Sequence, residues 1–310
     1  MFGASGMKIG IIGAGAMGSI FTYFFHNAGI ETTLYDIDRS TVDALRNGLR
    51  VVAGDTTVSF PVAITNDPAM LTACDIILVF VKSYATVPAM DVISSVLSPE
   101  SRIVTLQNGI GNNEAISRYI PVERIVFGTT TIGATKIDRS TVQYGGSVDI
   151  VIGGADMSAV DDVQRAFLDA GLSSTITDNP ETAVWKKALI NAAINPLGAI
   201  LSVSNGALLE NEYALLLQKS IIEESVAVAG ALGMHFDTTA VYAATRDVCV
   251  KTSKNLCSML QDVQSKRKTE IESINGAIVR YGAGHGIETP VNSMVSTIIH
   301  AIEESYTFNV

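Results

Sequence analysis

The stretch IGIIGAGAMGSIF, residues 9–21, carries three glycines in the spacing G-x-G-x-x-G. In a dinucleotide-binding turn, Gly13 permits the tight bend, Gly15 lets the backbone approach a pyrophosphate, and Gly18 lets helix and strand pack closely. The helix that begins here would direct its N-terminal N–H groups at the phosphates. The spacing alone is a weak signal, because a merely tight turn would also explain it. The candidate cofactor-binding residues of this stretch are Gly13, Gly15, Ala16, Met17 and Gly18.

The residues around this motif supply the context that the motif requires. A short apolar run over residues 8–12 predicts a strand before it, and a helical pattern to Asn27 follows, with Gly29 as its C-terminal stop. The next predicted strand, ETTLYD, ends in an acid, Asp36, 18 residues beyond Gly18. Strand, glycine turn, helix and terminal acid together predict a Rossmann-type βαβ unit that binds NAD(H) or NADP(H).

Asp36 bears on which of the two cofactors is bound. A carboxylate at this position accepts hydrogen bonds from the ribose 2′-hydroxyl of NAD(H) and repels the 2′-phosphate of NADP(H). Arg39 lies just beyond and could offset that repulsion. Asp36 therefore favours NAD(H) modestly, and a plain turn residue in DIDRS is the alternative interpretation.

The rest of the first half also alternates strands and helices. The runs CDIILVFVK (residues 74–82) and SRIVTLQNG (residues 101–109) are nearly continuous in apolar residues, as is typical of parallel strands buried on both faces. STVDALRNG (residues 40–48) predicts a second helix that begins near Ser40 or Thr41. LRVVAGDTTVSFPVAIT (residues 49–65) predicts a hairpin that turns at Gly54–Asp55.

Two polar residues follow predicted parallel strands directly. Lys82 ends the first of the apolar runs, and Asn108 with Gly109 ends the second. Ligands of open α/β sheets bind beyond the carboxyl ends of the strands. Lys82 and Asn108 are therefore candidate binding residues, although a solvated lysine and an ordinary Asn-Gly turn explain them equally well.

The second half is predicted to be helical from Ala183 onward, with 3.6-residue periodicity and almost no strand signal. The change of pattern places a boundary near residues 178–181. We therefore predict two domains: residues 1–178, an α/β Rossmann-type dinucleotide-binding domain, and residues 179–310, an all-α domain.

The first helix of this half, WKKALINAAINPLGAIL (residues 185–201), carries a polar line on an apolar background. Lys187, Asn191 and Asn195 recur every fourth residue and drift by only about 40° per step, so they form one stripe. Lys186 falls on another face. The stripe presents either a site or a solvated surface, and periodicity alone favours the solvated surface.

A proline in the same helix bears on whether the polar stripe forms a site or a solvated surface. Pro196 has no N–H, so the carbonyl of Ala192 loses its usual partner, which is costly unless another group uses it. A lysine near this apolar surface would have a lowered pKa suited to proton transfer near neutral pH.

A later segment, residues 256–282, is predicted to form one long helix with an apolar stripe. Glu270 falls at the margin of that stripe. It is either a solvated flanking residue, which the pattern favours, or a carboxylate turned toward a site.

Composition narrows the function classes. A net charge of -10 argues against a nucleic-acid partner, which requires a surplus of Lys and Arg. The three cysteines and four histidines show no metal-ligand spacing, so no metal site is expected. The start MFGASGMKIG is not typical of a signal peptide, and DIILVFV is far shorter than the roughly 20 residues that cross a bilayer. We expect a cytoplasmic protein with no membrane partner; a homodimer is compatible with the sequence, which does not determine the oligomeric state.

Taken together, these segments resemble the ketopantoate reductase family (2-dehydropantoate 2-reductases). The resemblance covers nearly the whole chain and rests on the glycine motif, LQNGIG, WKKALINAAINPLGAIL, SMLQDVQSKRKTEIESINGAIVRYG and HGIETPVN. It implies a Rossmann domain and an all-helical domain with the active site in the cleft between them. The implied reaction is the NAD(P)H-dependent reduction, usually with NADPH, of the 2-ketoacid 2-dehydropantoate to (R)-pantoate, in pantothenate and coenzyme A biosynthesis.

The resemblance also implies roles for single residues. Lys187 matches the family's catalytic lysine, and Glu270 matches its glutamate, which helps to orient the substrate. Asn191, Asn195 and Ser258 match substrate-binding residues, and Lys82 and Asn108 match residues near cofactor and substrate. This sequence departs from members that use NADPH, because they have an arginine where YDIDR stands here.

The departure leaves two alternatives to the pantoate reaction. Some relatives are NAD-dependent dehydrogenases of D-2-hydroxy acids such as mandelate. A non-catalytic dinucleotide sensor is the third hypothesis; Lys187 and Glu270 argue against it, because a sensor needs no proton donor.

Overall fold

The computed structural model describes residues 6–307. Residues 1–5 lie outside the described residues. They include most of the N-terminal MFGASG and part of the segment that is not typical of a signal peptide. The chain forms two compact units. The first comprises the described residues up to Gln107 together with Asn112–Glu181, and the second comprises Asn108–Gly111 with the described residues from Thr182.

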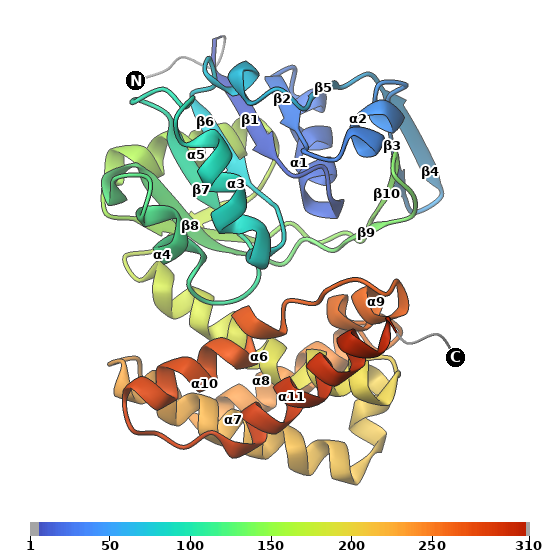
Figure 1. The fold of residues 1–310 in the computed structure, drawn as a ribbon, viewed down its shortest axis with the longest axis vertical. Helices are drawn as coiled ribbons and strands as arrows, with labels where there is room; N and C mark the ends of the chain where they lie inside the picture. Colours follow the sequence, from blue (N-terminus) through green and yellow to red (C-terminus); the bar gives the residue numbers. More distant parts are fainter. Residues whose placement is uncertain (1–5, 308–310) are drawn as a thin grey trace. The chain divides into compact units, whose positions relative to one another are not determined.

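The first unit is built on an eight-stranded sheet (Figure 1). In sheet order its strands are β12 (Ser174–Ile176), β11 (Ile150–Gly154), β8 (Ile125–Thr130), β7 (Arg102–Thr105), β6 (Ile76–Val79), β1 (Lys8–Ile12), β2 (Glu31–Tyr35) and β5 (Ala63–Thr65). All neighbours are parallel except the pair β8–β11. The chain leaves β1 toward β2 on one side and later returns to pair β6 on its other side. This reversal is the switch point at which doubly wound sheets bind their ligands, and it confirms the predicted Rossmann-type fold.

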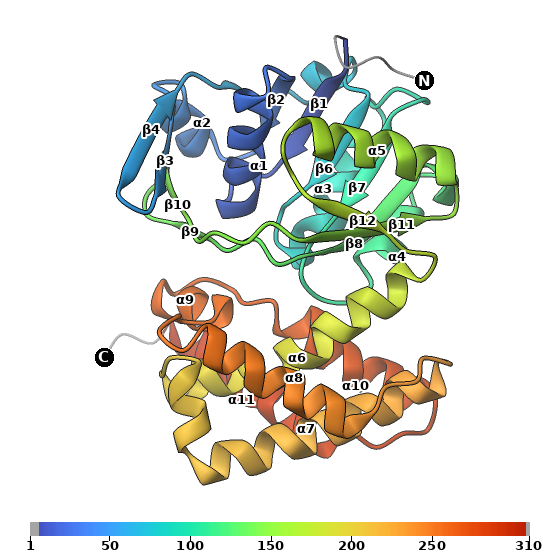
Figure 2. The same ribbon diagram turned by 180° about the vertical axis from the view of Figure 1, so that it is seen from behind.

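Helices cover both faces of this sheet. They are α1 (Ala16–Asn27), α2 (Arg39–Leu45), η1 (Pro68–Leu71), η2 (Ser83–Ala85), α3 (Thr86–Ile93), α4 (Asn112–Ser117), η3 (Val122–Arg124) and α5 (Met157–Asp169). Figure 1 shows α3 and α4 in front of the sheet, and Figure 2 shows α1 and α5 on the opposite face. Ile11 of β1 packs into the core beneath α1 and α5, whereas Ile12 joins the core beneath α3. The strands are apolar on both faces because both faces are covered.

A smaller, four-stranded sheet completes the first unit. Its order is β4 (Thr56–Phe60), β3 (Leu49–Ala53), β10 (Thr141–Tyr144) and β9 (Ala134–Lys136). β3 and β4 form the predicted hairpin, with Gly54 at a φ of +57° in its turn. β9 and β10 pack against α1, so this sheet reaches the helix that follows the glycine motif.

In the described part of the second unit, all regular elements are helical, as expected from the sequence. They are α6 (Pro180–Leu201), η4 (Gly206–Glu210), α7 (Glu212–Ala231), α8 (Thr238–Lys251), α9 (Ser258–Gln264), η5 (Ile271–Ser273), α10 (Asn275–Gly284) and α11 (Pro290–Ser305). Every residue from Ala192 to Ala199 of α6 is buried. Trp185 of α6 is buried and packs edge-on against Tyr281 of α10 in the same unit. Among the described residues, no helix has the length and apolar character needed to cross a membrane.

Two sequence-based predictions of helix limits are wrong. The second helix begins at Arg39, because the Asp38 carboxylate accepts the Ser40 N–H and forms the N-cap, in place of Ser40 or Thr41. The long helix predicted over residues 256–282 is broken after Gln264, where Lys266 adopts a φ of +51°. The chain turns back there, because Arg267 donates to the buried Asp262 through both its backbone N–H and its side chain. Glu270 consequently lies outside any α-helix.

Candidate active site

The glycine motif forms the turn between β1 and α1, and its outer glycines are required by close packing. Gly13 has a φ of +98°, and a Cβ on it would lie 2.9 Å from the backbone nitrogen of Val81. A Cβ on Gly18 would lie 2.0 Å from the carbonyl oxygen of Gly13. At Gly15, by contrast, an added Cβ would meet nothing within 4 Å. Gly13 and Gly18 thus close the turn, and Gly15 leaves its outer side open to an approaching group.

The N-terminus of α1 fits the pyrophosphate of a dinucleotide. Gly15 occupies the N-cap position and has no side chain to bond the free N–H groups, and the first turn contains no acidic residue. The N–H groups at the start of a helix carry partial positive charge and bind phosphate when they are left open. Gly15, Ala16 and Met17 are therefore the residues that would hold the phosphates.

Asp36 lies where the sequence predicted it, directly after β2. Its Oδ2 accepts the N–H of Ala14 at 2.8 Å, and its Oδ1 accepts the N–H of Asp38 at 2.9 Å. The side chain is half-buried, so part of it remains accessible beside the glycine turn. The carboxylate is held by two backbone donors and has a fixed orientation, which suits recognition of a ribose hydroxyl.

Lys82 lies half-buried at the start of η2, beyond the end of β6. Gln107, which the sequence analysis did not single out, ties this loop to the end of β7. Its Nε2 donates to the carbonyl of Val81 and to Thr86 Oγ1, and its Oε1 accepts from Thr105 Oγ1 at 2.8 Å. The position of Lys82 beside the switch point is thus set by an amide on the neighbouring strand.

The polar stripe of α6 turns inward. Lys187 and Asn191 are half-buried and Asn195 is only 5% exposed, whereas Lys186 is exposed. The structure therefore separates the two adjacent lysines, as the periodicity predicted, and excludes a fully solvated stripe.

The carbonyl that Pro196 leaves free has a partner. α6 continues through the proline, and the Nδ2 of Asn275 on α10 donates to the Ala192 oxygen at 3.1 Å. Asn275 Nδ2 also donates to Asn292 Oδ1 at 3.0 Å, and Asn292 Nδ2 donates to Glu224 Oε2 at 2.7 Å. A buried hydrogen-bond network therefore holds α6 in place just beyond Asn191.

We expect Asn275→Ala to lower the free energy of unfolding by about 1–3 kcal/mol, because it leaves the buried Ala192 carbonyl without this hydrogen bond. Urea denaturation measures the change. Asn27→Ala, at an exposed position on α1, is the control and should stay within about 0.5 kcal/mol of the wild type. Equal stabilities for the two variants would show that the Asn275 amide does not hold α6.

Glu270 is buried, only 7% exposed, contrary to the solvated flank that the pattern favoured. Ser273 donates to the Glu270 carbonyl through both its N–H (3.1 Å) and its Oγ (3.0 Å), and the Thr269 N–H bonds Glu303 Oε1 at 2.6 Å. The carboxylate acts on Lys187: burial lowers the pKa of Lys187 to about 8, while the negative charge of Glu270 opposes that shift. The structure thus brings Lys187 and Glu270 together from elements 83 residues apart in sequence.

The loop that carries Asn108 packs in the same unit. The N–H of Ile110 donates to the carbonyl of Ser273 at 2.7 Å. Gly109 has a φ of +90°, and a Cβ on it would lie 2.6 Å from the same oxygen. Asn108, which is half-buried, is therefore held close to the turn that follows Glu270. Ser273 is a second residue that the sequence analysis missed.

Ser258 is the first residue of α9 and is half-buried. The preceding residue, Cys257, donates from its Sγ to the carbonyl of Asn195 at 3.4 Å. This contact places the start of α9 beside the inner end of the polar stripe. No signal in the sequence linked Cys257 to α6, because a single thiol has no distinctive spacing.

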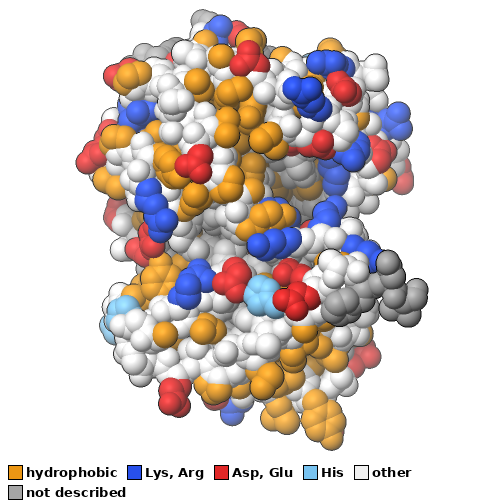
Figure 3. Space-filling view, viewed as in Figure 1, with side chains coloured by type: hydrophobic (Ala, Val, Ile, Leu, Met, Phe, Trp, Pro, Cys, Tyr) orange, Lys and Arg blue, Asp and Glu red, His pale blue; other side chains and the backbone are white. Residues whose placement is uncertain are grey.

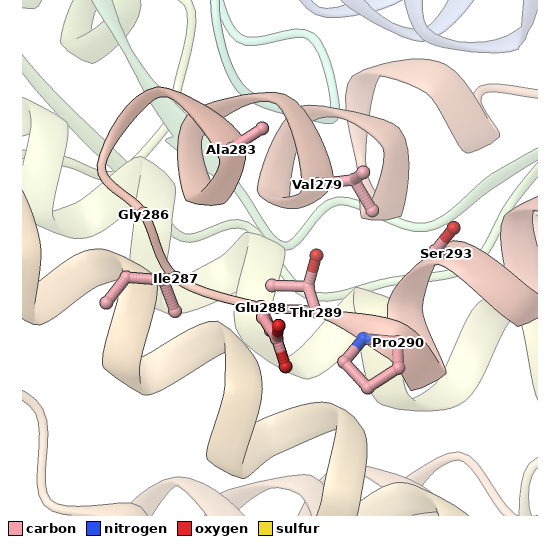
Figure 4. A pocket seen from close by; sticks show the side chains of 8 residues that line it. All are labelled: Val279, Ala283, Gly286, Ile287, Glu288, Thr289, Pro290 and Ser293. Atoms are coloured by element: carbon pink, nitrogen blue, oxygen red, sulfur yellow. The ribbon is translucent and has the colours of Figure 1, made fainter.

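The structure thus gathers five predicted residues in the second unit (Lys187, Asn191, Asn195, Ser258, Glu270), with Asn108 beside them. The predicted cofactor residues lie in the first unit (Gly13, Gly15, Ala16, Met17, Gly18, Asp36, Lys82), except Asn108, which lies in the second. A separate surface hollow of about 690 Å³ is lined by residues of α10, of α11 and of the turn between them (Figure 4). None of the predicted site residues lines that hollow.

Comparison with known proteins assigns the family. Residues 9–156 match the family model described as ketopantoate reductase PanE/ApbA, and residues 179–303 match the model of its C-terminal domain. The chain belongs to the ketopantoate reductase family. A 2-dehydropantoate 2-reductase of Halobacterium salinarum is 32% identical over 299 residues, which cover 94% of this chain and 98% of that protein. One from Vibrio cholerae is 32% identical over 309 residues, covering 97% and 99%.

Solved structures of the family show the same fold. A D-mandelate dehydrogenase in a ternary structure with NADH and anilino(oxo)acetate superposes with a TM-score of 0.92 at 28% identity, covering 97% of this chain and all of that one. A ketopantoate reductase from Ralstonia eutropha superposes with a TM-score of 0.89 at 27% identity, with the same coverage. The D-mandelate dehydrogenase of this comparison was solved with NADH, a nicotinamide dinucleotide.

Proposed function

We propose that this protein is a 2-dehydropantoate 2-reductase, which reduces a 2-ketoacid to the (R)-2-hydroxy acid with a nicotinamide cofactor. The observation that carries the proposal is the partly buried Lys187, whose pKa is lowered to about 8 and whose charge interacts with Glu270. A sensor that only binds a dinucleotide has no use for such a proton donor. The 32% identity to 2-dehydropantoate 2-reductases over nearly the whole chain supports the choice of reaction.

The chain's own residues would divide the work as follows. Lys187, as an ammonium ion, donates a hydrogen bond to the ketone oxygen and then transfers its proton to the developing alkoxide, which combines acid catalysis with electrostatic stabilisation. Glu270 keeps that lysine charged and binds the substrate hydroxyl. Ser258 binds the substrate carboxylate, and Asn191 and Asn195 orient lysine and substrate. The bound dinucleotide supplies the hydride.

We expect kcat/KM for ketoacid reduction to fall as the pH rises through about 8, because Lys187 then loses the proton it must donate. The pH profile of kcat/KM measures this. Glu270→Gln should move the fall to lower pH, because the carboxylate charge raises the pKa of Lys187. A fall whose midpoint is the same in both enzymes would contradict the electrostatic role of Glu270.

The cofactor of this enzyme is proposed to be NADH. Asp36 presents a carboxylate at the end of β2 that two backbone N–H groups hold in place. Its negative charge disfavours a 2′-phosphate, whereas the charge of the nearby Asp38 is paired with Arg139 at 2.6 Å. The D-mandelate dehydrogenase with the same fold was solved with NADH, which supports the assignment.

Asp36→Asn is expected to reduce the preference for NADH over NADPH by about tenfold, equivalent to about 1.4 kcal/mol. It removes the charge but keeps an oxygen that can accept the Ala14 N–H. The ratio of kcat/KM for the two cofactors is the measurement. Asp43→Asn, an exposed acid on α2, should leave the ratio unchanged. An unaltered ratio in Asp36→Asn would remove Asp36 from cofactor selection.

A matrix of rates tests the proposed reaction. Ketopantoate, phenylglyoxylate and branched 2-ketoacids are each offered with NADH and with NADPH. The proposal predicts the highest kcat/KM for ketopantoate with NADH. A clear lead for phenylglyoxylate or branched 2-ketoacids would establish the second candidate, a D-2-hydroxy acid dehydrogenase, which the TM-score of 0.92 to the D-mandelate dehydrogenase favours. Tight NADH binding without any turnover would establish the dinucleotide sensor.

A further inference from the structure

Lys136 is a partly buried lysine to which the proposed reaction assigns no role. It ends β9, the edge strand of the small sheet, and its side chain reaches the glycine turn 122 residues earlier in the chain. Its Nζ donates to the carbonyl oxygen of Ala14 at 2.7 Å and to Ser19 Oγ at 3.0 Å. Ser19 is fully buried on α1, so the ammonium group lies beneath the turn.

The carbonyl that Lys136 holds belongs to the peptide between Ala14 and Gly15. This peptide is trans, so its C=O and its N–H point in opposite directions. The Gly15 N–H therefore points away from Lys136, on a glycine whose added Cβ would meet open space. A cation bonded to the carbonyl also polarises the peptide and strengthens the N–H as a donor.

The two preceding peptides are held from another side. The Ala14 N–H donates to Asp36 Oδ2 at 2.8 Å, and the Gly13 N–H donates to the carbonyl of Tyr35 at 2.8 Å. Three successive peptides of the turn are thus fixed by different elements, the first two by the end of β2 and the third by β9.

A positive charge at this position is costly for the fold alone. Both groups that accept from the ammonium are neutral, and burial lowers the pKa of Lys136 to about 8 even though Asp36 and Asp138 oppose the shift. An uncharged donor could bond Ala14 and Ser19 at a smaller desolvation cost. The charge is useful if an anion binds on the other side of the same peptide.

We propose that Lys136 is a positioning residue for the dinucleotide: it fixes the Ala14–Gly15 peptide so that the Gly15 N–H faces the pyrophosphate, and it adds positive charge to that anion site. The inference rests on dinucleotide binding at the glycine turn, and not on which ketoacid is reduced. It predicts that the affinity for the phosphates depends on Lys136, while the chemistry at Lys187 does not.

The test compares Lys136→Met with the wild type and with Lys8→Met, a control at a more exposed lysine of β1 that pairs with Glu31. ADP and adenosine are the probes, measured by their displacement of bound NADH in a fluorescence titration, which also gives the Kd of NADH. We expect Lys136→Met to weaken NADH and ADP at least about tenfold, and adenosine less than about twofold. At saturating NADH, kcat should stay within about twofold of the wild type.

Two results would overturn the proposal: unchanged ADP binding, or equal losses for ADP and adenosine, which indicate a general distortion of the turn. Thermal unfolding shows whether Lys136→Met folds. If it does not, Lys136→Gln, which keeps a donor but removes the charge, gives the same comparison between ADP and adenosine. Because binding is measured without turnover, a wrong ketoacid assignment appears separately, as absent ketopantoate reduction with intact NADH binding.

Discussion

Lys187→Ala is expected to lower kcat/KM for ketoacid reduction by about 30- to 1,000-fold, a loss of about 2–4 kcal/mol of transition-state stabilisation. Lys187, on the inward stripe of α6, is the proposed proton donor, and its pKa of about 8 leaves it protonated at neutral pH. Steady-state kinetics at pH 7 with saturating cofactor measure the loss. Most of it should appear in kcat, because the ammonium acts on charge that develops in the transition state.

Lys186→Ala is the matched control, since Lys186 is the neighbouring residue but is exposed. It should stay near wild-type activity. Equal and small losses in both variants would rule out Lys187 as the acid.

Stability provides an independent check on Lys187. Its folded-state pKa of about 8 lies below the ordinary 10.5, so the unfolded chain binds the proton more tightly between these values, and stability rises with pH across that window. Below pH 8, Lys187 is charged in the folded protein, so burying this charge lowers the free energy of unfolding by its full cost. Lys187→Met, which removes the charge, should therefore be more stable than the wild type at pH 7 although it is inactive, and the difference should shrink above pH 8. Loss of activity through misfolding would give the opposite sign.

Gly18→Ala is expected to weaken NADH binding at least about a hundredfold and to lower the free energy of unfolding by about 1–3 kcal/mol. The added Cβ would lie 2.0 Å from the carbonyl oxygen of Gly13 and 3.2 Å from Ile11 Cγ2. The backbone oxygen cannot move without opening the turn, since Gly13 itself is pressed against the backbone after β6. Fluorescence titration with NADH and urea denaturation measure the two effects.

Gly15→Ala separates packing from cofactor approach. An added Cβ there meets nothing within 4 Å of the protein, so stability should be unchanged while NADH binding weakens.

A stable Gly18→Ala variant with normal NADH affinity would show that the turn tolerates the displacement, and the pyrophosphate would then have to bind elsewhere.

The charge distribution agrees with a small-molecule enzyme. On the face shown in Figure 3, basic side chains are interspersed with acidic ones. The cations with proposed roles, Lys82, Lys136 and Lys187, are partly buried. Local cations of this kind are sufficient to bind an anionic substrate on a protein of net charge -10.

The sequence by itself determined the features that depend on local geometry. The G-x-G-x-x-G turn, the apolar parallel strands and the change to helix near Ala183 follow from steric limits and from hydrophobic periodicity. The same periodicity placed Lys187 with Asn195 and apart from Lys186, since side chains four residues apart share one face of a helix. It also indicated that the Ala192 carbonyl needs a partner, because Pro196 lacks an N–H.

Only the tertiary structure decided which groups meet those needs. Asn275 bonds the Ala192 carbonyl from 83 residues away, and Lys136 reaches Ala14 across 122 residues. Glu270 is buried because the chain turns back at Lys266, whereas the periodic pattern predicted an unbroken helix with Glu270 at its edge. Periodicity records only which face of an element a residue occupies. Whether that face meets solvent, a carbonyl or a charge depends on the elements that pack against it, and those are brought together by the fold.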